Sequence, residues 1–197
     1  GYRHIADPAL RAQFGAEWQV ELQGAPGLRI PNMFEAALDG SFKGLYVQGE
    51  DLAQSDPNTQ HVTAALTAME CVVVQDLFLN ETARYAHVFL PGSSFLEKDG
   101  TFTNAERRIS RVRKVMEPLA GLADWEVTVR LANALGYPMR YDHPSQIMDE
   151  IARLTPTFSG VSFAKLDELG SLQWPCNAAA PAGTPTMHVG EFVRGQG

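Results

Sequence analysis

The 197-residue sequence lacks the features that mark several large classes of protein. No apolar run approaches the ~20 residues that a membrane-spanning helix requires, so we expect no contact with a membrane. The only cysteines, Cys71 and Cys176, lie far apart, which excludes a disulfide framework or a CxxC metal site and is typical of a reducing cytoplasm. The formal net charge of −7 argues against a nucleic-acid partner, because phosphates need a positive surface.

The usual nucleotide-binding and catalytic signatures are also absent. Neither GxGxxG after a strand nor GxxxxGK[ST] occurs, so a standard Rossmann NAD site and a P-loop are both unsupported. The five histidines are scattered without the spacing of a metal site, and no Ser/His/Asp set can be identified. The sequence therefore predicts no catalytic residue and no metal ligand within this chain.

Three short apolar runs organise what is present. Residues 44–47, 71–74 and 88–90 are brief and rich in Val, as in strands of a parallel sheet that are buried on both faces. An apolar helical face formed by Val62, Ala65, Leu66 and Met69 lies between the first two runs, which gives a strand–helix–strand unit. The fold class is therefore α/β, a mostly parallel sheet flanked by helices.

The flanking segments complete the predicted organisation. Residues 1–30 read as an irregular crossing segment with a short helix from Pro8 to Phe14, and residues 31–170 as the α/β domain. Helices are expected at 31–38, from the cap at Ser55-Asp56-Pro57 onward, at 124–135 and at 144–154, with a long loop at 92–105. Residues 171–197 are rich in Pro, Ala and Gly, and we expect an irregular, extended tail that leads to a C-terminal domain beyond this sequence.

Acidic side chains follow two of the predicted strands. Asp51 and Asp76 come at strand ends, where open α/β sheets form their ligand crevice. A carboxylate there can accept hydrogen bonds from a guanine edge or from ribose hydroxyls. Composition alone favours the alternative, in which these acids only cap the next helix.

Three charged features further along the sequence could also contact a ligand, but each has an equally simple structural explanation. Lys98, in a glycine-containing loop, could neutralise a phosphate or could be an exposed surface lysine. Asp124, before Trp125, is by itself best explained as a helix cap. The basic run 107–114 could contact phosphates or an acidic partner, but such a pattern is more often the solvated face of a strand or hairpin.

A set of sequence blocks resembles the molybdopterin oxidoreductase (DMSO reductase) family. The blocks are GED at 49–51, DP at 56–57, VVVQD at 72–76, TA at 82–83, VFLPG at 88–92, EKDGTFTN at 97–104 and ERR at 106–108. Within the family, the chain resembles an internal fragment, the third domain, of the catalytic alpha subunit of cytoplasmic NAD-dependent formate dehydrogenases. One departure is His87, where relatives usually carry Asp.

The resemblance implies a cofactor and the residues that contact it. The domain would be similar to a dinucleotide-binding fold and would bind one of the two molybdopterin guanine dinucleotides that surround molybdenum or tungsten. The cofactor-binding residues implied by position are Glu50, Asp51, Ser55, Gln75, Asp76, Gly92, Lys98 and Asp124. Strand-end carboxylates would bind the guanine, while loop amides, Ser55 and Lys98 would offset the pyrophosphate charge.

The resemblance also implies the reaction of a parent enzyme and the parts that lie outside this sequence. The parent would oxidise formate to carbon dioxide and pass electrons through 4Fe-4S clusters to NAD, using iron–sulfur and flavin partner subunits. The metal-ligating Cys or selenocysteine, the iron–sulfur segment and the rest of the alpha subunit have no counterpart here, so we expect a fragment that is inactive alone. Two alternatives stay open: another family member such as an assimilatory nitrate reductase, and a non-catalytic relative like the large iron–sulfur subunit of respiratory complex I.

Overall fold

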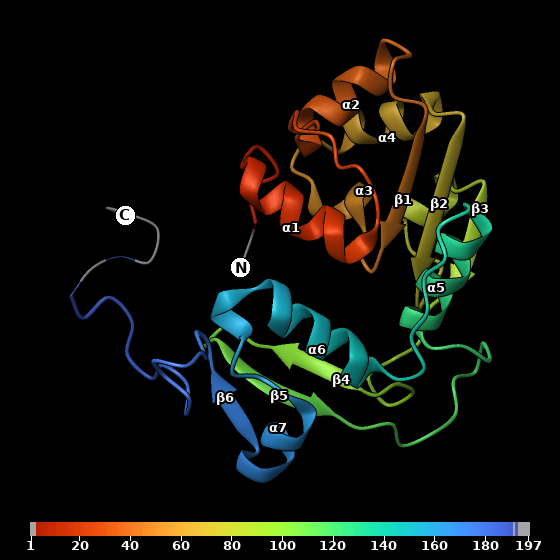
Figure 1. Cartoon of the computed structure of the whole chain (residues 1–197). Helices are drawn as coiled ribbons and strands as arrows, with labels where there is room; N and C mark the ends of the chain where they lie inside the picture. Colours follow the sequence, from red (N-terminus) through yellow and green to blue (C-terminus); the bar gives the residue numbers. More distant parts are fainter. Residues whose placement is uncertain (1–2, 191, 193–197) are drawn as a thin grey trace.

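The computed structural model describes residues 3–190 and residue 192, and this part of the chain forms two three-stranded sheets with their own helices (Figure 1). The first half contains α1 (Pro8–Trp18), α2 (Ile30–Leu38), β1 (Gly44–Gln48), α3 (Leu52–Ser55), α4 (Thr59–Ala68), β2 (Cys71–Asp76), the 3-10 turn η1 (Thr82–Tyr85) and β3 (Val88–Pro91). The second half contains β4 (Gly100–Thr103), β5 (Arg108–Val112), α5 (Asp124–Ala134), α6 (Pro144–Leu154), the 3-10 turn η2 (Pro156–Phe158), α7 (Phe163–Leu169) and β6 (Ser171–Gln173).

The first sheet is parallel, in the order β1-β2-β3, and its strands are those that the apolar runs predict. Gln48 pairs with Gln75, and Asp76 pairs with Pro91, so the three strands end at nearly the same level. Because parallel strands that end together place their following loops on one edge, residues 49–51, 76–79 and 92–94 converge there.

The core of this sheet is built from the predicted strand and helix faces. Val47, Val72 and Val74 pack against apolar side chains of α2 and α4, and Figure 1 shows both helices on the same side of the sheet. Val62, Ala65 and Leu66 of α4 are fully buried, as their helical spacing predicts. Gly40 follows α2 with a φ of +82°, a conformation that glycine adopts without strain, so it ends the helix where predicted.

The second sheet is antiparallel, in the order β4-β5-β6, and was not predicted. β4 lies in the segment 92–105 that was expected to be loop, and it pairs with the basic run, which forms β5. The turn between them is closed by the Asn104 side chain, whose Oδ1 accepts from Arg108 N at 2.9 Å. A separate core lies between this sheet, α6 and α7, and includes Ile109, Leu166 and Leu172.

Two expectations about the ends of the chain need correction. The helix of the crossing segment extends to Trp18, whose indole N–H donates to Glu150 Oε1 of α6 at 2.8 Å, so this segment is tied to the second half (Figure 1). At the other end, residues 171–173 form β6 rather than irregular tail, because they pair with β5. The domain boundaries at residues 30 and 170 stay a prediction.

Two local expectations were also wrong. The helix expected to begin at Ser55 begins at Thr59, because Asp56 closes a turn onto Asn58 N (2.9 Å) and Asn58 caps the helix. Cys71 stands exposed at the start of β2, although the run 71–74 was expected to be buried. Cys176 lies outside the helices and strands and is fully buried in the second core. No helix among the described residues combines the length and apolar character needed to cross a bilayer.

Candidate functional site

A polar cleft lies at the carboxyl ends of the parallel strands. Its volume is about 310 Å³, and it is lined by Gln48, Gly49, Gln75, Asp76, Leu77, Gly92, Ser93, Ser94, Phe95, Lys98, Phe102 and Asp124. These residues come from the ends of β1 and β2, from the loop after β3, from β4 and from the start of α5. The crevice rule for open α/β sheets therefore places the cleft correctly, and five of the eight predicted binding residues line it.

The Asp124 carboxylate is the hub of the cleft. Oδ1 accepts from Ser93 N at 2.9 Å and from Gln75 Nε2 at 3.0 Å, while Oδ2 accepts from Lys98 Nζ. The N-cap position of α5 belongs to Ala123, so the simple reading of Asp124 as a cap is wrong. Asp124 instead joins three segments that lie far apart in the sequence.

Lys98 is held at the cleft by the same hub. Its ammonium group donates to Ser93 O at 2.9 Å and to Asp124, and the two charged side chains are 22% and 23% exposed. An ammonium group has three N–H donors, so one donor remains for a further acceptor in the cleft. The alternative reading of Lys98 as an ordinary exposed loop lysine is therefore not supported.

Gln75 lies beneath the cleft with its amide engaged on both sides. The residue is 1% exposed, and its Oε1 accepts from Tyr46 Oη and from Gln48 Nε2, the latter at 3.3 Å. Burial, with the charge of Asp124 as a smaller cause, raises the pKa of Tyr46 above its ordinary value, so its hydroxyl stays a donor.

Asp76 and Gly92 stand together where β2 and β3 end. Asp76 Oδ1 accepts from Leu77 N at 2.6 Å and Oδ2 from Asn80 Nδ2 at 2.9 Å, which leaves one lone pair on each oxygen for another donor. Gly92 N donates to Asp76 O at 2.8 Å. A Cβ on Gly92 would lie 3.2 Å from Asp76 C and 3.3 Å from Asp124 Oδ1, so glycine permits this close approach.

The structure does not bring the other three predicted residues into the lining of this cleft. Asp51 Oδ1 accepts from Thr82 N at 3.0 Å and from Thr82 Oγ1 at 2.6 Å, so its carboxylate holds η1. Glu50 Oε1 accepts from Ser55 Oγ at 2.5 Å in an exposed contact. The involvement of Glu50, Asp51 and Ser55 in ligand binding stays a prediction.

Sequence reasoning missed Tyr46, Gln48 and Ser93. Ser93 is 3% exposed and receives Asp124 N on its hydroxyl at 3.0 Å, and its place directly after the strand-end Pro-Gly pair was a usable signal. The alternating direction of β-strand side chains puts Tyr46 and Gln48 on one face of β1, but which face meets the cleft is decided only by the sheet.

Arginines of the basic run 107–114 form ion pairs and hydrogen bonds with other parts of this chain. Arg111 pairs with Asp99 and Asp167, at 3.4 and 2.9 Å, and its guanidinium lies 3.8 Å from the centroid of the Phe163 ring. Arg107 donates to the carbonyl oxygens of three residues near the C-terminus, Trp174, Thr184 and Pro185. These contacts favour the hairpin interpretation of the run over a phosphate-binding surface.

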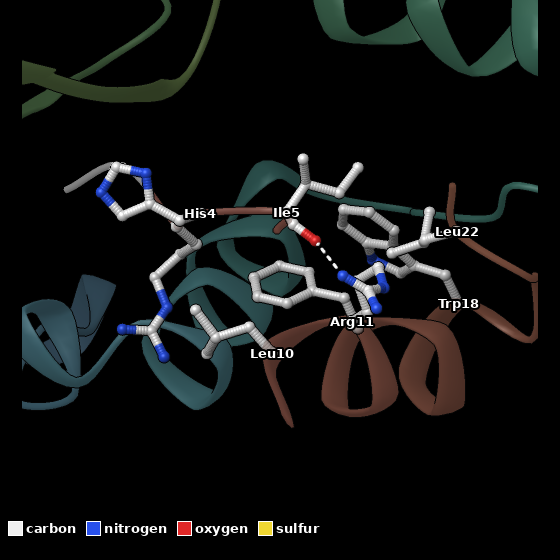
Figure 2. Close-up of a pocket in the computed structure, with 8 residues that line it drawn as sticks. His4, Ile5, Leu10, Arg11, Trp18 and Leu22 are labelled. Atoms are coloured by element: carbon white, nitrogen blue, oxygen red, sulfur yellow. Dashed lines mark hydrogen bonds between the residues drawn. The ribbon is translucent and has the colours of Figure 1, made fainter. Parts of the chain in front are cut away.

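Two further hollows can be compared with the cleft: one is continuous with it, and the other is lined by different residues. A groove of about 290 Å³ between β4 and α6 shares Lys98, Phe102 and Asp124 with it, and so extends it. A hollow of about 200 Å³ lies beside α1 and is walled mainly by apolar side chains, with Arg11 donating to Ile5 O at 2.7 Å (Figure 2). None of the predicted binding residues lines the hollow beside α1.

Comparison with known proteins gives consistent matches. A family model described as molybdopterin oxidoreductase matches residues 4–134. A Staphylococcus haemolyticus protein named "Putative formate dehydrogenase" is 47% identical over 195 residues, which is 98% of this chain and 20% of that protein. The Bacillus subtilis protein named "Probable oxidoreductase YjgC" is 44% identical over 179 residues, which is 90% of this chain and 18% of that protein.

Among solved structures, acetylene hydratase from Pelobacter acetylenicus superposes with a TM-score of 0.62 at 17% identity, covering 92% of this chain and 27% of that one. At this identity the likeness concerns the fold alone. The chain spans about a fifth of the length of the curated relatives that it matches.

Proposed function

This chain belongs to the molybdopterin oxidoreductase family, and from that premise we propose that its strand-end cleft holds one end of a molybdopterin guanine dinucleotide. The observation that carries the proposal is the convergence of Asp76, Gly92, Lys98 and Asp124 on one cleft at the carboxyl edge of the parallel sheet. A volume of about 310 Å³ lies at the low end of small-molecule sites, so it suits part of a dinucleotide.

The residues of the cleft fit the chemistry of such a group. Asp76 keeps lone pairs on both oxygens, which suit the paired N–H donors of a guanine edge. Lys98 keeps one N–H donor and a positive charge, which suits a phosphate oxygen. Asp124 balances part of that charge and holds the Lys98 side chain at the cleft.

The protein's part in this proposal is placement. When bound, the cofactor supplies metal-centred redox chemistry, with molybdenum or tungsten as the metal. The residues of this chain would anchor one pterin dinucleotide and orient it through groups that are already held by hydrogen bonds. In this proposal the cleft is a binding site, and another part of a longer polypeptide would supply the metal ligand.

For that longer polypeptide we propose formate oxidation to carbon dioxide in the cytoplasm. The names of the relatives support the substrate. Electrons would leave through 4Fe-4S clusters to NAD, carried by iron–sulfur and flavin partner subunits. Formate-dependent and nitrate-dependent dye assays on the full polypeptide distinguish this substrate from the nitrate alternative, and nitrate turnover without formate turnover would contradict it.

The binding proposal is tested by Asp76→Asn and Lys98→Ala in the full polypeptide. Asp76→Asn replaces an acceptor oxygen by an NH₂ donor, and Lys98→Ala removes a positive charge. Each change should cost ~1.5–3 kcal/mol of binding free energy, or roughly ten- to a hundredfold in affinity for the guanine dinucleotide. The measurement is the amount of guanine dinucleotide and metal retained per subunit after gel filtration. The parent polypeptide, rather than the 197-residue chain, is used because the cofactor is shared with its other parts.

Matched control variants separate this effect from general damage. Asp56→Asn removes an acid that closes a turn onto Asn58 N, much as Asp76 holds Leu77 N, but it does not line the cleft. Lys114→Ala removes an exposed lysine paired with Glu117. Full cofactor content in folded Asp76→Asn and Lys98→Ala proteins, equal to that of the controls, would show that the cleft does not hold the dinucleotide.

A further inference from the structure

Tyr46 stands behind the cleft rather than in its wall. It lies on β1 opposite Val73 of β2, and its hydroxyl donates to Oε1 of Gln75, while Gln48 Nε2 donates to the same oxygen at 3.3 Å. The contacts run from β1 through β2 to the start of α5, the elements that frame this end of the first sheet (Figure 1). Tyr46 is thus the outer member of a chain of side chains that ends at Lys98.

The direction of the Gln75 amide is fixed by this chain. An amide presents an acceptor oxygen on one side and an NH₂ donor on the other. The oxygen faces two donors, and the NH₂ faces the Asp124 carboxylate at 3.0 Å. The reversed amide would place its oxygen against the Asp124 carboxylate, so that contact would be lost in a buried site and the donation from Tyr46 would have to reverse.

The orientation of the Gln75 amide in turn determines which partner each oxygen of Asp124 binds. Oδ1 is occupied by Gln75 Nε2 and Ser93 N, at 3.0 and 2.9 Å, which leaves Oδ2 for Lys98. Because the carboxylate is held on one side by two neutral donors, the lysine is confined to the other side, where it faces the cleft. The position of the cleft's cation therefore depends on a hydroxyl that is not in the cleft wall.

We propose that Tyr46 is a positioning residue, which orients Gln75 and thereby sets the Asp124–Lys98 pair for binding the cofactor. This inference rests on the proposed function, because it assigns a role toward the same ligand. It also changes the role of Gln75, whose side chain was expected to contact the cofactor, into that of a buried link between β1 and the cleft.

The test is Tyr46→Phe in the full polypeptide, alone and combined with Lys98→Ala. Losing one neutral hydrogen bond from the chain should weaken retention of the pterin dinucleotide roughly three- to tenfold. In the Lys98→Ala background the same substitution should have little further effect, because the group that it positions is gone. A residue that only stabilises the fold would weaken retention equally in both backgrounds.

Tyr141→Phe is the matched control. Tyr141 also donates its hydroxyl to a side chain, Glu150 Oε2 at 2.5 Å, is also partly buried, and does not line the cleft. Its pKa is raised, like that of Tyr46, with burial as the largest cause. We expect cofactor retention unchanged in Tyr141→Phe, and any loss of thermal stability to be similar in the two variants.

Each outcome has a separate meaning. If Lys98→Ala and Asp76→Asn both keep the cofactor, the proposed function is wrong, and if Lys98→Ala alone keeps it, the positioning role is overturned. If Lys98→Ala loses it while Tyr46→Phe does not, or if the two losses simply add, the positioning role is overturned and the proposed function stands. Should Tyr46→Phe fail to fold, Gln75→Met removes the same link, and its effect on retention must likewise disappear in the Lys98→Ala background.

Discussion

Asp51→Ala should loosen a specific part of the fold. Asp51 Oδ1 accepts from the backbone N and the hydroxyl of Thr82, at 3.0 and 2.6 Å, and Oδ2 approaches Glu81 N at 3.4 Å. Thr82 is fully buried, and its hydroxyl also accepts from Ala53 N at 3.0 Å. Removing the carboxylate therefore leaves the backbone N–H and the hydroxyl of the buried Thr82 without their acceptor.

The size of the effect follows from these contacts. A hydrogen bond to a charged group contributes ~1.5–3 kcal/mol, and two bonds to one residue are not additive, so the local loss is about 2–4 kcal/mol. If η1 opens locally, this loss corresponds to roughly 30- to 700-fold faster amide exchange. The increase should be confined to the segments that Asp51 joins, residues 51–55 and 80–86.

Hydrogen–deuterium exchange measured by mass spectrometry resolves those segments even in a multidomain protein, where one melting temperature would not. Glu50→Ala is the matched control, because the neighbouring acid touches only the exposed Ser55 hydroxyl. A surface change of this kind typically alters stability by less than ~0.5 kcal/mol, or about twofold in exchange. Equal exchange in Asp51→Ala and Glu50→Ala would refute the assignment of Asp51 to the fold.

Three further predictions concern the second half of the chain. Hydrogen bonds from Leu119 N and Ser94 hold the pKa of Glu97 below its ordinary value. The stabilisation is therefore present above the ordinary carboxyl pKa and is lost as pH falls through the lowered one. The protection factor of the amides at 115–119, which compares exchange with the intrinsic rate at the same pH, should fall on acidification, and a Glu97→Gln variant with the same pH response would contradict this. Gly160→Ala would place a Cβ 2.8 Å from Cys176 Sγ, so we expect a loss of ~1–3 kcal/mol in urea unfolding, and unchanged stability would show that this contact relaxes freely. Arg107→Ala should speed proteolysis at 174–185 by removing the guanidinium that holds three carbonyls there, whereas cleavage at the wild-type rate would show that packing alone secures the segment.

The main sheet and much of the cleft could be predicted from local patterns. Short Val-rich runs indicate parallel strands, although only β2 is largely buried and the edge strands β1 and β3 are partly exposed. The ends of such strands must gather on one edge, which brings Gln75, Asp76 and Gly92 together. Lys98 and Asp124 lie outside the strands, and each had an equally simple alternative from the residues alone, so only the family resemblance assigned them to the cofactor. The antiparallel sheet was missed because β6 is three residues long and pairs with a strand about sixty residues earlier.

The sequence by itself determined the strands of the parallel sheet and the helices α2, α5 and α6, because strand and helix periodicity depends on neighbouring residues. It also determined which polar groups reach the carboxyl edge of the sheet. Only the tertiary structure decided what each polar group contacts, because the partners are distant in sequence: Asp51 meets Thr82, and Gln75 meets Asp124. Asp51 accepts from Thr82, which is distant in sequence, and so holds η1, whereas Asp76 accepts from the nearby Leu77 and Asn80 and keeps one lone pair on each oxygen at the cleft.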